Sequence, residues 1–172
     1  MGRNKKKKRK DFSHLEDVYL ELVDLTVHPM DPDVVKRQIR EIFEANPTGG
    51  HFDYMFAVRD IADHEYTKRF MQSWDYGEEI KELTYKIGFQ FGGTVERLGL
   101  PDRSEFPTGS SLSLPGVLER YTEALLAAGY HFHLWDTQSD ELLASVFSTS
   151  NSERVKELLI LAEDRLEPEF TS

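Results

Sequence analysis

One stretch in the C-terminal half of the chain, YHFHLWDTQSDELLASVF, constrains the fold more than any other. Residues 130–135 and 142–147 are rich in aromatic and aliphatic side chains, and the polar segment from Asp136 to Asp140 separates them. Two such runs joined by a short polar segment predict a β-hairpin, because Asp and Ser favour tight turns through their own side chains. The chain is therefore expected to contain an antiparallel sheet.

Five further segments show apolar residues at the three- and four-residue spacing of an amphipathic helix. Capping boxes, Ser13 with Glu16 and Ser150 with Glu153, are expected to start the first and the last of these helices, and Gly129 is expected to end the fourth. The first two are expected to pack as a helical hairpin. The predicted helices run from Ser13 toward Pro29, from Asp31 toward Pro47, from Glu78 to Phe91, from Pro115 to Ala128 and from Ser150 to Leu166.

The segment HFDYMFAVRDIADHEYTKRFMQSWD, residues 51–75, is ambiguous. Its residues over 54–58 alternate as in a strand, although the same region also fits one face of a helix. We favour two strands, the second containing Phe70 and Trp74, with the polar DIADHEY segment as the turn between them.

These elements predict an α+β fold with an N-terminal helical hairpin, antiparallel strand pairs that form one sheet, and helices packed on a face of that sheet. A chain of 172 residues fits one such domain and can bury about 70% of its unfolded surface. We expect this domain to cover residues 11–172, with a Pro- and Ser-rich loop over 98–114.

The first ten residues, MGRNKKKKRK, form a basic arm on an otherwise acidic chain. The whole chain has a net charge of −10, whereas residues 11–172 hold 14 Lys and Arg against 31 Asp and Glu, a net charge of −17. Because like charges repel, residues 1–10 are expected to be disordered, and the arm favours phosphates that the acidic body repels. The cations of the arm are Arg3, Lys5, Lys6, Lys7, Lys8, Arg9 and Lys10.

Several kinds of protein and site are disfavoured by features that the chain lacks. It contains no cysteine, which excludes disulfides, thiolate zinc sites and cysteine nucleophiles. No apolar run approaches the roughly 18–20 residues of a membrane span, so we expect a cytoplasmic protein with no membrane partner. No phosphate-binding glycine loop, nucleophile elbow or zinc-protease motif is present, so the sequence gives no positive evidence for an enzyme and implies no cofactor.

Two histidines and the hairpin turn are the candidate sites for chemistry. His131 and His133 lie two residues apart on a predicted strand, so both rings face the same side and can share a metal ion. The alternative, which we favour, is a polar face of that strand. In the turn, Asp136, Ser139, Asp140 and Glu141 can bind a hard cation through oxygen atoms, but Asp and Ser also stabilise tight turns, and a structural turn is favoured.

The stretch LPGVLERYTEALLAAGYHFHLWDTQSDELLASVF resembles an uncharacterised bacterial family, a domain of unknown function, in which a helix and a Gly-Tyr step precede a strand, an Asp-x-x-Ser-Asp turn, a second strand and a helix. The upstream WDYGEEIKEL is similar to the family's entry to its preceding helix, whereas Glu141-Leu142 departs from the family, in which an aromatic residue follows the Asp. The resemblance implies the α+β fold and a bacterial origin, and it supplies no catalytic residue. The landmarks in this chain are Gly129-Tyr130, Asp136, Ser139 and Asp140.

Three function hypotheses follow from these features. The first, which we favour, is a non-catalytic interaction module of immunity- or inhibitor-like type, whose acidic body binds a basic protein surface. The second is a nucleic-acid- or ribosome-associated protein that is tethered by the basic arm. The third is a metal-dependent hydrolase that uses His131 and His133.

Overall fold

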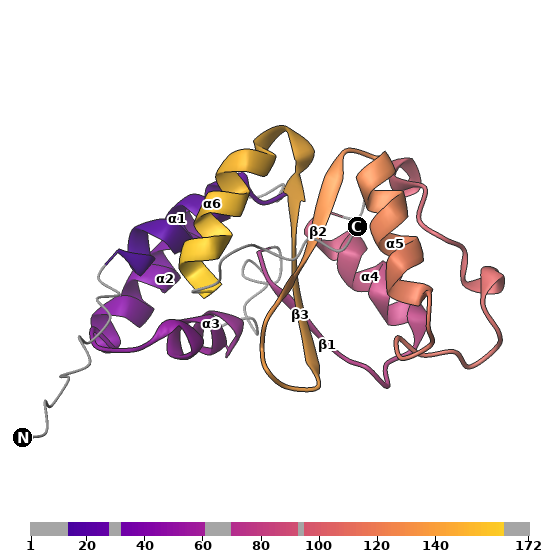
Figure 1. Cartoon of the computed structure of the whole chain (residues 1–172), viewed down its shortest axis with the longest axis horizontal. Coiled ribbons are helices and arrows are strands. Elements are labelled where there is room, and N and C mark those ends of the chain that lie inside the picture. The colour runs from indigo at the N-terminus through magenta and orange to yellow at the C-terminus, as the bar shows by residue number, and fades with distance from the viewer. Residues whose placement is uncertain (1–13, 28–31, 61–69, 93–94, 164–172) are drawn as a thin grey trace, which may run out of the picture.

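The computed structural model describes residues 14–27, 32–60, 70–92 and 95–163. It confirms the predicted α+β class (Figure 1). The helices are α1 (Leu15–Leu25), α2 (Asp33–Ala45), α3 (His51–Asp60), α4 (Ile80–Gln90), α5 (Val117–Ala127) and α6 (Ser152–Glu163). The strands are β1 (Gln72–Asp75), β2 (Tyr130–Trp135) and β3 (Glu141–Ser148), and short 3-10 helices cover Glu96–Leu98, Arg103–Glu105 and Thr149–Asn151.

The three strands form one antiparallel sheet in the order β1-β3-β2. The predicted hairpin is confirmed, and it pairs Trp135 of β2 with Leu143 of β3. On the other side of β3, Trp74 of β1 lies opposite Leu142. β3 is therefore the central strand, and all its residues from Leu142 to Phe147 are buried.

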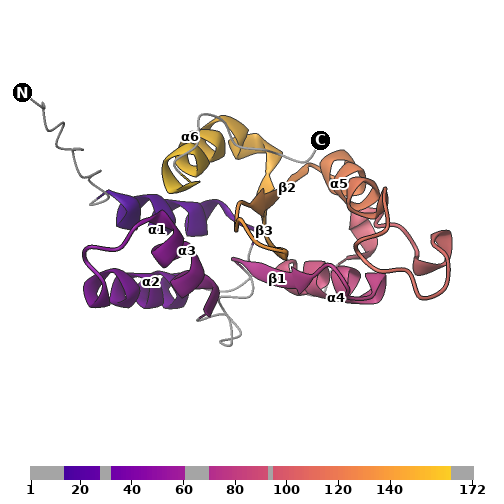
Figure 2. The same cartoon turned by 60° about the horizontal axis from the view of Figure 1, so that its bottom comes forward.

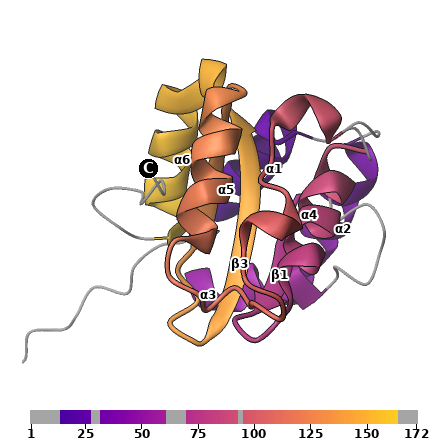
Figure 3. The same cartoon turned by 90° about the vertical axis from the view of Figure 1, so that its right-hand side faces the viewer.

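Helices cover both faces of this sheet, so the structure has three layers (Figure 1, Figure 2). On one face, residues of α1, α2, α3 and α6 form a first core with Trp135 and Leu143. On the other face, residues of α4 and α5 form a second core with Phe132 and Val146, and Figure 3 shows these two helices in front of the sheet. Coverage of both faces explains why residues 142–147 form a nearly continuous apolar run. The predicted packing of helices on a face thus occurs on both faces.

Several predicted helix boundaries can be compared with the structure. α1 and α2 contact each other, which confirms the N-terminal helical hairpin, although the predicted caps Ser13 and Asp31 lie outside the described residues. Gly129 has φ = +94°, a left-handed conformation that suits glycine, and it follows the end of α5 as predicted. The capping box predicted at Ser150 is wrong: the chain tightens into a 3-10 turn after the sheet, and the hydroxyl of Ser148 accepts the N–H of Ser150.

The strand predicted over residues 54–58 is also wrong, because His51–Asp60 form α3. Tyr54 and Val58, four residues apart, are both buried in the first core, and the ring of Tyr54 stacks on Phe43 of α2 with 3.9 Å between centroids. The alternating pattern is a local signal, whereas packing against α2 selects the helix. The second predicted strand is confirmed as β1, and most of the predicted turn between the two lies outside the described residues.

Each of the two tryptophans in the chain reports on one core, since Trp74 lies in the second core and Trp135 in the first. Because both cores share one sheet, we expect them to unfold together as the predicted single domain, residues 11–172. In urea, the fluorescence of Trp74→Phe and of Trp135→Phe should each follow the circular dichroism of the same variant. Separate transitions for fluorescence and circular dichroism would show that the two cores are independent.

Candidate functional site

The β2–β3 turn contains Asp136, Ser139 and Asp140, the polar residues of the predicted turn motif. The carboxylate of Asp136 accepts the N–H of Gln138 at 3.1 Å, and the hydroxyl of Ser139 accepts the N–H of Glu141 at 3.3 Å. Asp140 is exposed. Two of the three side chains therefore shape the turn, and the third adds charge to its surface.

The tip of this turn has an unusual backbone conformation. Gln138 has φ = +50°, and among the described residues it is the only non-glycine with a positive φ. This conformation costs free energy and persists where neighbouring contacts hold it. Here Thr137, which is buried, donates its hydroxyl to the carbonyl of Glu141 at 2.9 Å and accepts the N–H of Ser139 at 3.3 Å. The turn is therefore held in one shape.

The turn borders a hollow of about 420 Å³, which we call the acidic hollow. Its wall contains three acidic residues, Asp136, Asp140 and Glu141, beside Tyr76, which is 41% exposed, and none of the described residues that line it is a lysine or arginine. The other residues that line it are Leu134, Trp135, Thr137, Gln138, Ser139 and Leu142. The hollow thus combines carboxylates with an exposed aromatic ring.

The negative charge of the acidic hollow is offset only in part. Arg59 of α3 pairs with Glu141, with 2.5 Å between Nη1 and Oε2. Asp75 of β1 lies directly opposite Glu141 in the sheet, and like charges in that position repel each other. A further cation at this end of the sheet would reduce that repulsion.

A second hollow of about 330 Å³, which we call the helix hollow, shares Asp136 and Gln138 with the first. It is completed by residues of two helices: His51, Phe52 and Met55 of α3, and Ala162 and Glu163 of α6. Polar and apolar side chains therefore meet in its wall.

Glu163, the last residue of α6, contributes a buried carboxylate to this wall, with a side chain that is 3% exposed. Its Oε1 accepts the backbone N–H of Asp136 at 2.8 Å, and its Oε2 lies 3.2 Å from Nε2 of His133, whose side chain is fully buried. Burial, and then the charge of Glu163, raises the pKa of Tyr19 in the first core. A buried polar cluster thus joins the turn, β2 and α6.

The two candidate histidines both contact α6 from the same side of β2. Nε2 of His131 lies 2.5 Å from the hydroxyl of Ser152 at the start of α6, whereas His133 contacts Glu163 at its end. Burial, and then the charge of Lys156, lowers the pKa of His131. Among the described residues, no group of three or more His, Cys, Asp or Glu side chains is placed to hold a metal ion, so the metal site stays a prediction without a third ligand.

The sequence patterns did not single out four polar or aromatic residues of these hollows: Tyr76, Thr137, Gln138 and Glu163. The sequence did contain a signal for Glu163. It lies four residues after Leu159, on the buried face of α6, where a carboxylate stands out among apolar residues. Nothing in the sequence indicates a positive φ at a glutamine. The seven cations of the arm, residues 3–10, lie outside the described part of the chain.

These features define a class of protein: an α+β domain whose short antiparallel sheet lies between helices and ends in an acidic turn. The chain belongs to the family described as Domain of unknown function (DUF6630), which it matches over residues 19–167. The match confirms the resemblance that rested on Gly129-Tyr130 and the turn, and it includes every residue that lines the two hollows. No curated protein and no solved structure matches the chain.

In the ranges that the structure describes, none of the helices is both long enough and apolar enough to cross a bilayer.

Proposed function

We propose that this protein is an interaction module that binds a basic protein surface through the acidic hollow. The observation that supports this most directly is the wall of the hollow, in which Asp136, Asp140 and Glu141 lie beside the exposed Tyr76 and no described lining residue is a lysine or arginine. Carboxylates accept the hydrogen bonds of Lys and Arg, and the face of an aromatic ring attracts a cation. A cationic side chain of a partner therefore fits this hollow best.

The placement of the chain's own cations supports the same proposal. Within the described ranges, many cations pair with carboxylates of the same chain, which offsets their positive charge locally. The cations in such pairs are Lys36, Arg59, Lys81, Lys86, Arg120, Arg154 and Lys156. The surplus of acidic residues in the body is then expected to attract basic partners at long range.

A peptide of six arginines is a defined probe for the acidic hollow. We expect it to bind with an affinity that falls as salt is added, and to shift the amide resonances of Tyr76, Ser139 and Asp140. Asp140→Asn should weaken binding about fivefold, since an exposed ion pair contributes up to about 1 kcal/mol. Isothermal titration calorimetry and NMR would measure both effects.

Glu119→Gln is the matched control, because it removes the same charge from an exposed position on α5. We expect it to leave the affinity for the peptide nearly unchanged. If Glu119→Gln weakens binding as much as Asp140→Asn, the peptide responds to net charge alone and the proposed site is wrong.

The basic arm remains a separate proposal. Residues 1–10 lie outside the described part of the chain, and their attraction for nucleic acid rests on their charge alone.

A further inference from the structure

We infer that the helix hollow is a binding site for a small organic ammonium ion, a primary amine that carries a short apolar chain. This site is distinct from the acidic hollow proposed for the protein partner, although Asp136 and Gln138 border both. The charge of the helix hollow, its apolar residues and its size each point to this class of ligand.

The negative charge of the helix hollow comes from the two acidic residues in its wall, Asp136 and Glu163. Among the described residues that line this hollow there is no lysine or arginine, so a bound ammonium ion would add a permanent positive charge beside these carboxylates.

Glu163 is held in place to receive such a ligand. Its side chain is 3% exposed, and a carboxylate at that depth needs hydrogen bonds or a cation. The N–H of Asp136 donates to Oε1, and His133, which contacts Oε2, does not itself line the hollow. An ammonium group has three N–H donors, which the carboxylates of Glu163 and Asp136 and the amide oxygen of Gln138 can accept.

The apolar part of the wall fits a short hydrocarbon chain. Phe52, Met55 and Ala162 line the hollow, and the ring of His51 packs on Phe52 with 4.3 Å between centroids. Methionine adapts to ligands of varied shape. A volume of about 330 Å³ lies at the lower end of the range for small-molecule sites, which favours an amine with a few carbon atoms.

Pentylammonium chloride is the probe that we propose for this site. Titrated into the full-length ¹⁵N-labelled protein, it should shift the amide resonance of Asp136, because that N–H donates to Glu163. Neutral pentanol and anionic pentanoate, which have the same carbon chain, should bind at least tenfold more weakly. Equal shifts from pentanol and pentylammonium would overturn the assignment of a cation site, as would the absence of any shift at Asp136.

Two variants separate the roles of charge and apolar contact. Glu163→Gln keeps an acceptor for the N–H of Asp136 and removes the charge, so the affinity for pentylammonium should fall at least tenfold. Phe52→Ser, at a partly exposed position, should lower the affinity for pentylammonium several-fold and leave the affinity for methylammonium unchanged. This variant provides the test if the Glu163 variant does not fold. Unchanged pentylammonium affinity in either folded variant would contradict the site.

Asp140→Asn distinguishes this inference from the proposed function, because Asp140 lines the acidic hollow and not the helix hollow. Asp140→Asn should lower the affinity for the arginine peptide and leave the affinity for pentylammonium unchanged. Glu163→Gln should lower the affinity for pentylammonium and leave the affinity for the peptide unchanged. Loss of amine binding in Asp140→Asn would show that the amine occupies the acidic hollow and would overturn the inference.

Discussion

Replacing His133 by alanine will lower the free energy of unfolding by about 3–5 kcal/mol in urea denaturation at pH 7. The side chain of His133 is fully buried, and its Nε2 lies 3.2 Å from Oε2 of Glu163, which is itself 3% exposed. Alanine removes the imidazole from a carboxylate that has little contact with water, and it leaves a cavity between β2 and α6. Both effects destabilise the folded state.

Arg154→Ala is the matched control, because it breaks an ion pair with Glu21 in which the two side chains are 51% and 40% exposed. We expect Arg154→Ala to lower the free energy of unfolding by less than about 1 kcal/mol. The double variant His133→Leu with Glu163→Gln should recover part of the His133→Ala loss, because it fills the cavity, removes the buried carboxylate and keeps an acceptor for the N–H of Asp136. A loss in His133→Ala no larger than that in Arg154→Ala would contradict a stabilising buried contact between His133 and Glu163.

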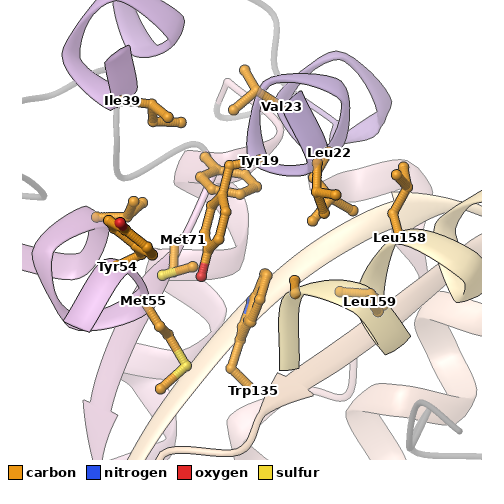
Figure 4. Packing of buried hydrophobic residues seen from close by; sticks show 14 of the residues in the cluster. Tyr19, Leu22, Val23, Ile39, Tyr54, Met55, Met71, Trp135, Leu158 and Leu159 are labelled. Atoms are coloured by element: carbon orange, nitrogen blue, oxygen red, sulfur yellow. The ribbon is translucent and has the colours of Figure 1, made fainter. Parts of the chain in front are cut away.

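Replacing Tyr19 by alanine will lower the free energy of unfolding by about 3–5 kcal/mol, whereas phenylalanine at the same position will raise it by about 1 kcal/mol. The ring of Tyr19 is fully buried and stacks on Trp135 with 6.0 Å between centroids. Figure 4 shows its hydroxyl oxygen in the core near Met71 and Trp135, and no described residue gives that oxygen a hydrogen-bond partner. The ring therefore stabilises the core while the hydroxyl destabilises it.

Tyr121→Phe is the control for the hydroxyl, because the Tyr121 hydroxyl lies 2.5 Å from Oγ1 of Thr84 in the second core. This substitution should lower the free energy of unfolding by about 1 kcal/mol, which is the opposite sign to Tyr19→Phe. Changes of the same sign in the two variants, measured in urea, would show that the hydroxyl of Tyr19 does have a partner.

Tyr19 also affects how stable the protein is in alkali. Burial, and then Glu163, raises the pKa of Tyr19, so its phenol stays neutral in the folded protein at a pH where the unfolded chain ionises, above about 10. The free energy of unfolding therefore falls as the pH rises above that value. Tyr19→Phe should remove this residue's part of the fall.

Local sequence signals predicted most elements of the fold. The hairpin, the amphipathic helices and the glycine at the end of α5 were predictable because each depends on residues close together in the chain. The exception is α3. Residues 54–58 of α3 fit both the alternation of a strand and one face of a helix. The contact of Tyr54 with Phe43 of α2 decides between the two conformations. A local pattern cannot contain that contact.

The candidate site was predictable only in part. Asp136, Ser139 and Asp140 were identified from the turn motif, and the side chains of Asp136 and Ser139 do shape the turn. Tyr76 and Glu163 were not, because the turn meets β1 and α6 only in the folded chain. Local sequence patterns do not reveal contacts between residues that are far apart in the chain.

The sequence alone determined the acidic body, the basic arm, the sheet hairpin and the helices that pack on it, because charge and hydrophobic periodicity are properties of nearby residues. The tertiary structure alone decided that helices cover both faces of the sheet, and that His133 and Glu163, thirty positions apart, share a buried contact. Burial is a property of the whole packed chain. The free energy of an ionisable group therefore depends on neighbours that only the fold supplies.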